Sequence, residues 1–332
     1  MLTQLKHYLS LLGLIVLVLL VGVLTSSVHD SQFDQSVVEF LIRMVVVIGI
    51  YLFVGNSGIT SFGHIGFMAI GAYASAWQTC CPSLKPMTMP GLPDFLLRNS
   101  VPFVPSVVMS GLLAAAVALV VGMFMMRLSG IAASTATFAF LIIVNVVYSN
   151  WREVTGGTSS IVGIPIEVDV WTAVVWVVIA LIGAHAFENS RYGLSLRASR
   201  DDEVAAKAAG VNVGAQRLVA FVGSAFIVGI GGALYSHFLG VLTTDTFYLD
   251  LTFITLAMLV IGGVGSLAGA TVGVLTISIL IDILRRLEAG VSVGGTMVSL
   301  PSGLEEILLG VAMLLILVYR PKGLFGGRTT LT

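Results

Sequence analysis

The chain has 332 residues, of which 57% are hydrophobic and 10% charged, with a mean hydropathy of +1.03. Soluble domains carry about 25% charged residues, so this chain cannot cover itself with a polar surface. The composition excludes a soluble enzyme and a disordered chain, and the net charge of −1 excludes the basic footprint of a nucleic-acid binder. We therefore predict an integral membrane protein whose main solvent is the lipid bilayer. The adjacent Cys80 and Cys81 are expected to be unpaired.

Long uncharged segments predict how the chain crosses the bilayer. A hydrocarbon core about 30 Å thick needs about 20 apolar residues per helix. The uncharged segments are residues 7–29, 44–84, 99–126, 128–151, 170–187, 218–244, 251–281 and 307–319. The second is long enough for two passes, with Gly55-Asn56-Ser57-Gly58 as the turn between them. We predict an all-α polytopic membrane protein with about ten transmembrane helices, eight at the fewest, forming a single transmembrane domain over residues 1–332.

Two of these segments leave alternatives open. Residues 251–281 would measure about 46 Å as one straight helix, and the segment contains several glycines. It therefore forms either two short crossings or one crossing and a re-entrant piece. The N-terminal segment, in which Lys6 precedes the apolar stretch Tyr8–Leu24, resembles a signal peptide. Its apolar stretch is longer than a typical signal-peptide core, so we expect a retained helix.

The distribution of Lys and Arg predicts the orientation. Ten passes with the N-terminus inside place ten basic residues in the cytoplasm and five outside, with Arg43 near a helix end. The cytoplasmic set is Lys6, Arg127, Arg191, Arg197, Arg200, Lys207, Arg217, Arg320, Lys322 and Arg328, and the external set is Lys85, Arg98, Arg152, Arg285 and Arg286. Both termini are then cytoplasmic. The external loops, at 28–36, 80–101, 150–169, 240–250 and 287–302, are too small to capture a dilute solute.

The largest predicted cytoplasmic loop, residues 188–217, contains a short helix with recognisable ends. Ser199 can cap the N-terminus of this helix, with Asp202 at its third position. Acidic residues 201–203 suit the positive end of the helix dipole, and Gly210 is placed as the left-handed stop. Alanines at 205, 206, 208 and 209 leave a smooth body that another protein can approach closely. The alternative is a solvated connector whose charges only enforce topology.

These segments carry a resemblance to a known family. Ala205-Ala206, three residues and Gly210 resemble the coupling loop of ABC importer permeases, although Glu203 is one place early and the downstream Ile-x-Leu-Pro is missing. Residues 56–73, 150–151, 155–157, 163–165, 257–269 and 319–324 resemble segments of branched-chain amino-acid permeases, in order, from about residue 36 to 326. The chain thus resembles the longer of the two homologous membrane subunits of a branched-chain amino-acid ABC importer.

The resemblance implies a fold, a set of partners and a location. The fold is that of an ABC importer permease in a bacterial inner membrane. The partners are a homologous permease subunit, two cytoplasmic ATP-binding subunits and a periplasmic solute-binding protein. No cofactor is implied for this chain, because ATP binds to the partner subunits. Residues expected to couple to the ATPase are Arg200, Glu203, Ala205, Ala206 and Gly210.

Glycine-rich segments in the two halves of the chain predict a substrate pathway. Small residues allow close helix packing in lipid, and that explanation remains open. The same density of glycine also permits broken helices, which are tolerated where the backbone faces protein or a water-filled cavity. A zwitterionic substrate's carboxylate would suit a half-helix N-terminus. The expected pathway residues are Asn56, Ser57, Gly58, Thr60, Ser61, Gly63, His64 and Gly66 in one segment and Gly262, Gly263, Gly265 and Gly269 in the other.

The sequence gives little support for an ATP-binding motif, a catalytic triad or a metal site. No lysine follows a glycine, so the chain has no Walker A motif. Ser61 and His64 share a helical face without an acid nearby, so we expect no catalytic triad, and the histidines lack metal-site spacing.

Three alternatives to a branched-chain amino-acid importer are weighed. An ion-coupled secondary transporter normally needs a mid-membrane acidic residue, whereas only His64, His185 and His237 are titratable inside the predicted spans. A membrane enzyme acting on lipid would need a nucleophile or metal cluster that the sequence does not offer. Within the resemblance, a permease for urea or short amides is the nearest alternative.

Overall fold

Helices form most of the regular structure. The computed structural model describes residues 2–27, 31–289, 291–293, 296–298, 307, 308, 310, 311, 314, 318, 319 and 323–325. The helices are α1 (Leu2–Ser27), α2 (Ser31–Ser57), α3 (His64–Thr79), α4 (Lys85–Thr88), α5 (Asp94–Arg98), α6 (Phe103–Met125), α7 (Gly130–Asn150), α8 (Arg152–Thr155), α9 (Val170–Asn189), α10 (Arg191–Asp201), α11 (Glu203–Ala208), α12 (Val213–Leu239), the 3-10 helix η1 (Asp245–Phe247), α13 (Leu249–Gly262) and α14 (Leu267–Ala289). Two short antiparallel strand pairs join β1 (Ile161–Val162) to β2 (Val241–Leu242) and β3 (Val291–Val293) to β4 (Thr296–Val298).

Seven of the described helices are long and apolar enough to cross a membrane: α1, α2, α6, α7, α9, α12 and α14. The predicted all-α polytopic membrane fold is thereby confirmed. Two other predicted crossings are shorter helices, α3 with 16 residues and α13 with 14, or about 24 and 21 Å at 1.5 Å per residue. The last predicted crossing, near residues 303–319, lies mostly outside the described residues.

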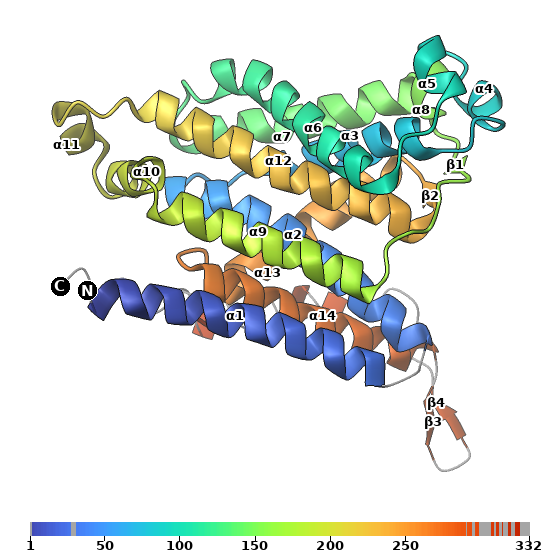
Figure 1. Ribbon diagram of the computed structural model, residues 1–332. Coiled ribbons are helices and arrows are strands. Elements are labelled where there is room, and N and C mark those ends of the chain that lie inside the picture. Colours follow the sequence, from blue (N-terminus) through green and yellow to red (C-terminus); the bar gives the residue numbers. More distant parts are fainter. Residues whose placement is uncertain are drawn as a thin grey trace.

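The centre of the bundle is formed by α2 and α12, which lie in the middle of Figure 1. In the most apolar 18-residue stretch of each helix, 94% of the residues of α2 and 72% of those of α12 are buried, compared with 22% in α1. Glycine lets α3 approach α12 at backbone distance, since a Cβ at Gly71 would lie 2.1 Å from the Gly229 carbonyl oxygen. This crossing needs glycine because no side chain fits between the two helices.

The two ends of the bundle carry different connections (Figure 1). Helices α10 and α11 lie at one end, together with the start of α1. At the opposite end lie α4, α5, α8 and the β1–β2 pair. The basic residues on α10 and α11 and those on α4, α5 and α8 therefore occupy opposite ends, as the predicted division between cytoplasmic and external loops requires. Which end faces the cytoplasm stays a prediction.

Two predicted interruptions take a different form in the structure. The expected turn Gly55-Asn56-Ser57-Gly58 starts later, because α2 continues through Ser57 and the chain leaves the helix at Gly58, where φ is +72°. The side chain of Asn56 donates to the Leu52 carbonyl at 2.9 Å, within the same helix. Residues 251–281 fold as α13 and α14, two helices joined by residues 263–266.

Candidate functional site

The break between α2 and α3, residues 58–63, contains non-helical backbone inside the protein. Ile59, Ser61 and Gly63 of this segment are buried, as expected for irregular backbone at membrane depth. The segment is fixed to α7: the amide of Phe62 donates to the Thr137 hydroxyl at 3.2 Å. Its backbone also approaches α7 closely, because a Cβ at Gly63 would lie 2.5 Å from the Thr137 carbonyl oxygen.

His64 begins α3 directly after this break and is 1% exposed. Its Nδ1 lies 2.7 Å from the Ser61 hydroxyl. The ring is surrounded by Phe53, Phe67 and Phe221, with centroid distances of 5.6, 6.2 and 5.6 Å. Its Nε2 is buried without a hydrogen-bond partner among the described residues. The pair Ser61–His64 thus lies in an aromatic enclosure, and no carboxylate is hydrogen-bonded to the ring in the described part of the chain.

The remaining predicted pathway residues of this segment differ in their surroundings. Asn56 and Ser57 are buried at the end of α2, and the Asn56 Oδ1 has no partner among the described residues. Gly58 and Thr60 are exposed. Gly66 faces α7, where an added Cβ would lie 3.1 Å from the ring of Phe140. The polar atoms that a solute could use here are therefore those of Asn56 and His64.

The second glycine-rich segment packs α13 against α14. A Cβ at Gly262 would lie 2.0 Å from the Gly269 carbonyl oxygen, and one at Gly269 would lie 2.7 Å from the Gly263 carbonyl oxygen. Close helix packing therefore accounts for these glycines by itself. Gly263 has φ of +118° at the end of α13. No described residue lies within 4 Å of the Cβ position of Gly265.

The structure brings the two predicted pathway segments together. A Cβ at Gly55, near the end of α2, would lie 2.9 Å from the carbonyl oxygen of Val264 in the α13–α14 turn. The end of α13, next to this turn, is contacted by the C-terminal part of the chain, because the amide of Leu324 donates to the Ile261 carbonyl at 2.8 Å. The end of α2 and the α13–α14 turn are thus in direct contact.

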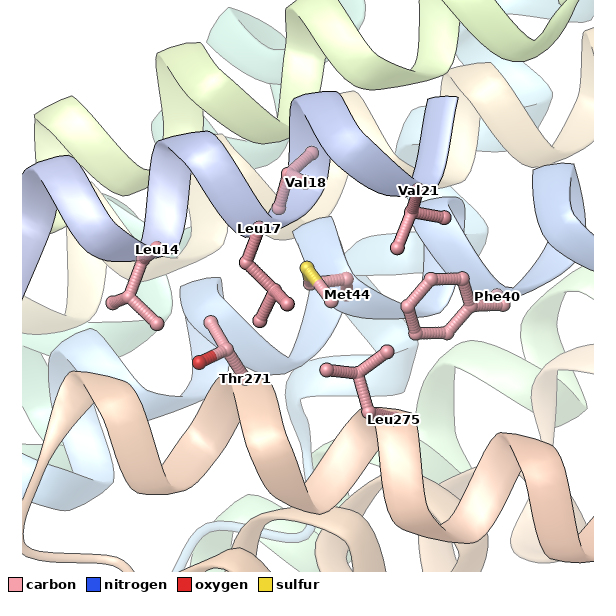
Figure 2. Close-up of a pocket in the computed structure, with 8 residues that line it drawn as sticks. All are labelled: Leu14, Leu17, Val18, Val21, Phe40, Met44, Thr271 and Leu275. Carbon is pink, nitrogen blue, oxygen red and sulfur yellow. The ribbon is translucent and has the colours of Figure 1, made fainter. Parts of the chain in front are cut away.

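Two cavities near α2 and α14 do not offer a free site for a zwitterion. The first lies between α1, α2 and α14 and is shown in Figure 2. Its side chains are apolar except Thr271, whose hydroxyl donates to the Ala268 carbonyl at 2.9 Å. The second has Glu39, Arg43, Asp282 and Arg285 in its lining.

The charges of the second cavity are engaged in ion pairs. Glu39 contacts Arg43 at 2.5 Å and Arg285 at 3.3 Å, and Asp282 pairs with Arg286 at 2.8 Å. The two acidic residues near helix ends, Glu39 and Asp282, are thus neutralised by arginines, which leaves neither as an isolated carboxylate for ion coupling.

The 188–217 loop forms two short helices with separate caps. The Ser190 hydroxyl caps α10 by accepting from the Gly193 amide at 3.2 Å. Asp202 caps α11, because its carboxylate accepts from the amides of Val204 and Ala205, each at 2.9 Å. The predicted cap at Ser199 is wrong: Ser199 lies inside α10 and its hydroxyl donates to the Leu196 carbonyl at 2.7 Å. Asp202 has the extended backbone that an N-cap residue needs, so its carboxylate can reach the free amides of α11. Ser199 is helical, so its hydroxyl cannot take this position.

The predicted stop at Gly210 is confirmed. Gly210 has φ of +85°, and its amide donates to the Lys207 carbonyl at 3.0 Å. The next amide, that of Val211, donates to the Ala206 carbonyl at 3.0 Å. This pair of bonds is a Schellman motif, in which a glycine ends the helix and satisfies its last carbonyls.

The two faces of α11 have distinct roles. On the inner face, Glu203 pairs with Arg217 of α12 and with Lys207, each at 2.8 Å. Hydrogen bonds from Lys207 and Arg217 lower the pKa of Glu203 below its usual 4.5. Ala206 is 7% exposed and packs within its own chain, and its coupling to a partner stays a prediction. Ala205 and Val204 are exposed, Val204 at 79%.

A family model described as the permease component of the branched-chain amino acid transport system matches residues 32–317. The chain belongs to this family. It is 25% identical over 327 residues to the high-affinity branched-chain amino acid transport system permease protein LivM of Escherichia coli (strain K12), covering 86% of this chain and 68% of that protein. The LivM protein of Salmonella typhimurium matches with the same identity and coverage. A probable LivM of Methanocaldococcus jannaschii is 32% identical over 151 residues, or 43% of this chain and 42% of that protein.

This permease is accordingly a transport subunit and not an enzyme, and it is a multi-pass membrane protein. In the described part of the chain, no group of three or more His, Cys, Asp or Glu side chains could hold a metal ion. The Ser61–His64 pair is therefore interpreted as part of the transmembrane structure.

Several residues of the candidate site were not found from the sequence. Phe53, Phe221 and Thr137 surround the α2–α3 break, but they come from three helices that are far apart in the chain. No spacing pattern joins them. Asp202 could have been found as a cap, because an aspartate directly before Glu203 and an alanine-rich segment is a known N-terminal signal.

Proposed function

We propose that this permease is a membrane-spanning subunit of an ATP-driven importer that moves branched-chain, hydrophobic amino acids into the cell. The family supports the transport role, and the names of the Escherichia coli and Salmonella relatives favour these substrates. The chain has no Walker A motif, so hydrolysis must come from other polypeptides. The proposed partners are a homologous permease subunit, two cytoplasmic ATPase subunits and a periplasmic solute-binding protein.

The exposed face of α11 is the observation that carries this proposal. Helix α11 projects at the end of the bundle that holds α10 (Figure 1), is capped at both ends, and presents Val204 and Ala205 outward. A small, apolar, rigid helix end suits a groove on another protein. We assign it to the ATPase subunit, so that this end of the bundle faces the cytoplasm of a bacterial cell. We likewise propose that both chain termini are cytoplasmic, in agreement with the excess of Lys and Arg on that side.

We place the solute pathway along the α2–α3 break. Asn56 Oδ1 and His64 Nε2, for which no hydrogen-bond partner is found in the described part of the chain, supply polar atoms there. The aromatic rings around His64 supply apolar walls. The contact between Gly55 and the Val264 carbonyl brings the α13–α14 turn to the same place.

Reconstitution of the complex tests the proposal. The permease, its homologous partner and the ATPase subunits are placed in liposomes with the solute-binding protein, and uptake of radiolabelled leucine, isoleucine, valine and urea is measured with and without ATP. ATP-dependent uptake of the three amino acids is the expected result. Uptake of urea alone would move the assignment to short amides. Leucine accumulation by the isolated chain under a proton or sodium gradient would contradict the ATP-driven mechanism.

A further inference from the structure

The C-terminal end of α2 is capped by an arginine from α10. The last carbonyls of a helix have no partner within the helix and form the negative end of its dipole. One of these, the carbonyl of Gly55, accepts a hydrogen bond of 2.7 Å from Nη1 of Arg200. A cation is the favoured partner at this position. Arg200 forms no ion pair with a carboxylate among the described residues, and its side chain remains partly exposed at the surface.

The chain at Gly58 makes room for this arginine. Gly58 has φ of +72°, which ends α2 and starts the break. A Cβ on Gly58 would lie 2.8 Å from Cγ and 3.1 Å from Cδ of Arg200. The aliphatic part of Arg200 thus lies across Gly58 while its guanidinium reaches Gly55. Both the backbone conformation and the missing side chain of Gly58 are needed for this arrangement.

Helix α10, which carries Arg200, is packed firmly against the end of α9. The guanidinium of Arg197 pairs with the Glu188 carboxylate of α9 at 2.9 Å. Leu196 and Ser199 of α10 are buried. At the start of the helix, a Cβ on Gly193 would lie 2.3 Å from the Phe187 carbonyl oxygen, so the turn from α9 into α10 is closely packed. Arg200 thus joins α10 directly to the end of α2.

We propose that Arg200 is a positioning residue that transmits movement of α10 and α11 to the end of α2 and to the 58–63 break. The inference rests on the proposed function, in which α11 docks on the ATPase and the break borders the pathway. The sequence predicts Arg200 among the residues that couple to the ATPase. The structure gives it a second contact, inside the permease, with the Gly55 carbonyl. In the same place, Gly55 touches the carbonyl of Val264, so the α13–α14 turn shares this connection.

The first test measures solute uptake per ATP hydrolysed in the reconstituted complex. Arg200→Gln should lower solute uptake per ATP hydrolysed at least about fivefold. The ratio of uptake to hydrolysis is the readout, because the sequence also predicts Arg200 among the residues that couple to the ATPase. Arg200→Lys should restore part of the uptake, because an ammonium can also bond a helix C-terminal carbonyl. Arg191→Gln is the matched control: Arg191 is an exposed arginine of the same helix and contacts the Tyr192 ring instead. A purely structural role would lower hydrolysis, assembly and uptake together.

The second test changes the other side of the contact. Gly58→Ala should reproduce the Arg200→Gln defect, because the new methyl group displaces Arg200. Gly130→Ala is its control, since Gly130 also has positive φ, +58°, but its Cβ position has no neighbour within 4 Å among the residues that the structure describes. The double variant Gly58→Ala with Arg200→Gln should be no worse than the more defective single variant, as expected for residues acting through one contact.

These outcomes separate the two proposals. If the wild-type complex imports solute with ATP and Arg200→Gln keeps the wild-type uptake per ATP, the transmission by Arg200 is overturned and the proposed function stands. Additive effects of Gly58→Ala and Arg200→Gln would overturn it as well. If the wild-type complex shows no ATP-dependent uptake, the proposed function fails, and the transmission role falls with it.

Discussion

Glu203 of α11 and Arg217 of α12 are joined by an ion pair of 2.8 Å across the turn that contains Gly210. Arg217 is buried, at 7% exposure, whereas Glu203 lies at the surface end of the contact. A buried guanidinium without its carboxylate is costly. The pair therefore fixes the inner face of α11 to the bundle and leaves its outer face available.

This ion pair predicts a pH-dependent position of α11. The pKa of Glu203 is lowered by Lys207 and Arg217, so the carboxylate contributes stability above the unfolded value near 4.5, and that contribution is lost as the pH falls through the lowered pKa. A spin label on the exposed Ala208 should become more mobile as the pH is lowered below 4.5. Glu203→Gln should show the mobile signal already at pH 7.

The control for this experiment is Asp201→Asn, because Asp201 is an exposed acid of the neighbouring helix for which no ion pair is found among the described residues. It should retain the wild-type dependence on pH. An unchanged spectrum for Glu203→Gln at pH 7 would show that the ion pair does not hold α11.

The two adjacent alanines of α11 should respond differently to the same substitution. Ala206 is buried, so Ala206→Trp overfills the contact within the permease, at a typical cost of about 1–3 kcal/mol. Ala205 is exposed, so Ala205→Trp should leave the thermal stability of the isolated permease unchanged and reduce co-purification of the ATPase subunits. Melting temperature and co-purification are measured for both variants. Normal ATPase binding by Ala205→Trp would remove the docking role of this face.

Lys85 predicts a third result, at the opposite end of the bundle. Its side chain is fully buried, and its ammonium donates to the carbonyls of Gln78, Leu96 and Asn99 at 3.2, 2.8 and 2.8 Å. Burial lowers the pKa of Lys85. Lys85→Met would remove the ammonium donor from these carbonyls. That of Gln78 still accepts from the Val101 amide at 3.0 Å, whereas those of Leu96 and Asn99 lose the donor found here, and a buried group that loses its partner typically costs about 1–3 kcal/mol. We expect a lower melting temperature and faster proteolysis within residues 80–101.

Arg98→Gln is the matched control for Lys85→Met, because Arg98 is an exposed cation on α5 in the same region. Amine-reactive reagents give an independent reading. In the folded wild type, Lys85 should be modified far more slowly than the exposed Lys207. Equal modification of the two lysines would show that residues 80–101 do not enclose Lys85 when the protein is embedded in a membrane.

The sequence predicted those features that local chemistry decides. The turn at Gly210 follows from a glycine after an alanine-rich helix, and the membrane spans follow from hydropathy. Features decided by contacts between distant residues were missed. Whether Ala205 or Ala206 faces outward depends on where Arg217 of α12 holds Glu203. The end of α2 likewise depends on distant residues, because Arg200 of α10 donates to the Gly55 carbonyl.

The glycine-rich segments show the same division. Their composition predicted interrupted helices, and the structure has breaks at 58–63 and 263–266. Composition does not separate a pathway from close packing, since both need small residues. Only the positions of neighbouring backbones show that Gly262 and Gly269 lie against each other, and that Gly265 is not packed against another described residue.

The last prediction compares leucine substitutions at Gly66 and Gly265. At Gly66 even a Cβ would lie 3.1 Å from the Phe140 ring, so Gly66→Leu must push α3 away from α7 next to the break. It should lower the free energy of unfolding by about 1–3 kcal/mol, as is typical of overpacking. It should also reduce ATP-dependent uptake. At Gly265 no described residue lies within 4 Å of the Cβ position, so Gly265→Leu should leave the stability of the isolated permease unchanged. Its uptake in the complex then reports on function without a packing defect. Reduced uptake with normal stability would place Gly265 at the pathway or at a partner surface, whereas wild-type uptake would restrict the pathway to the α2–α3 break.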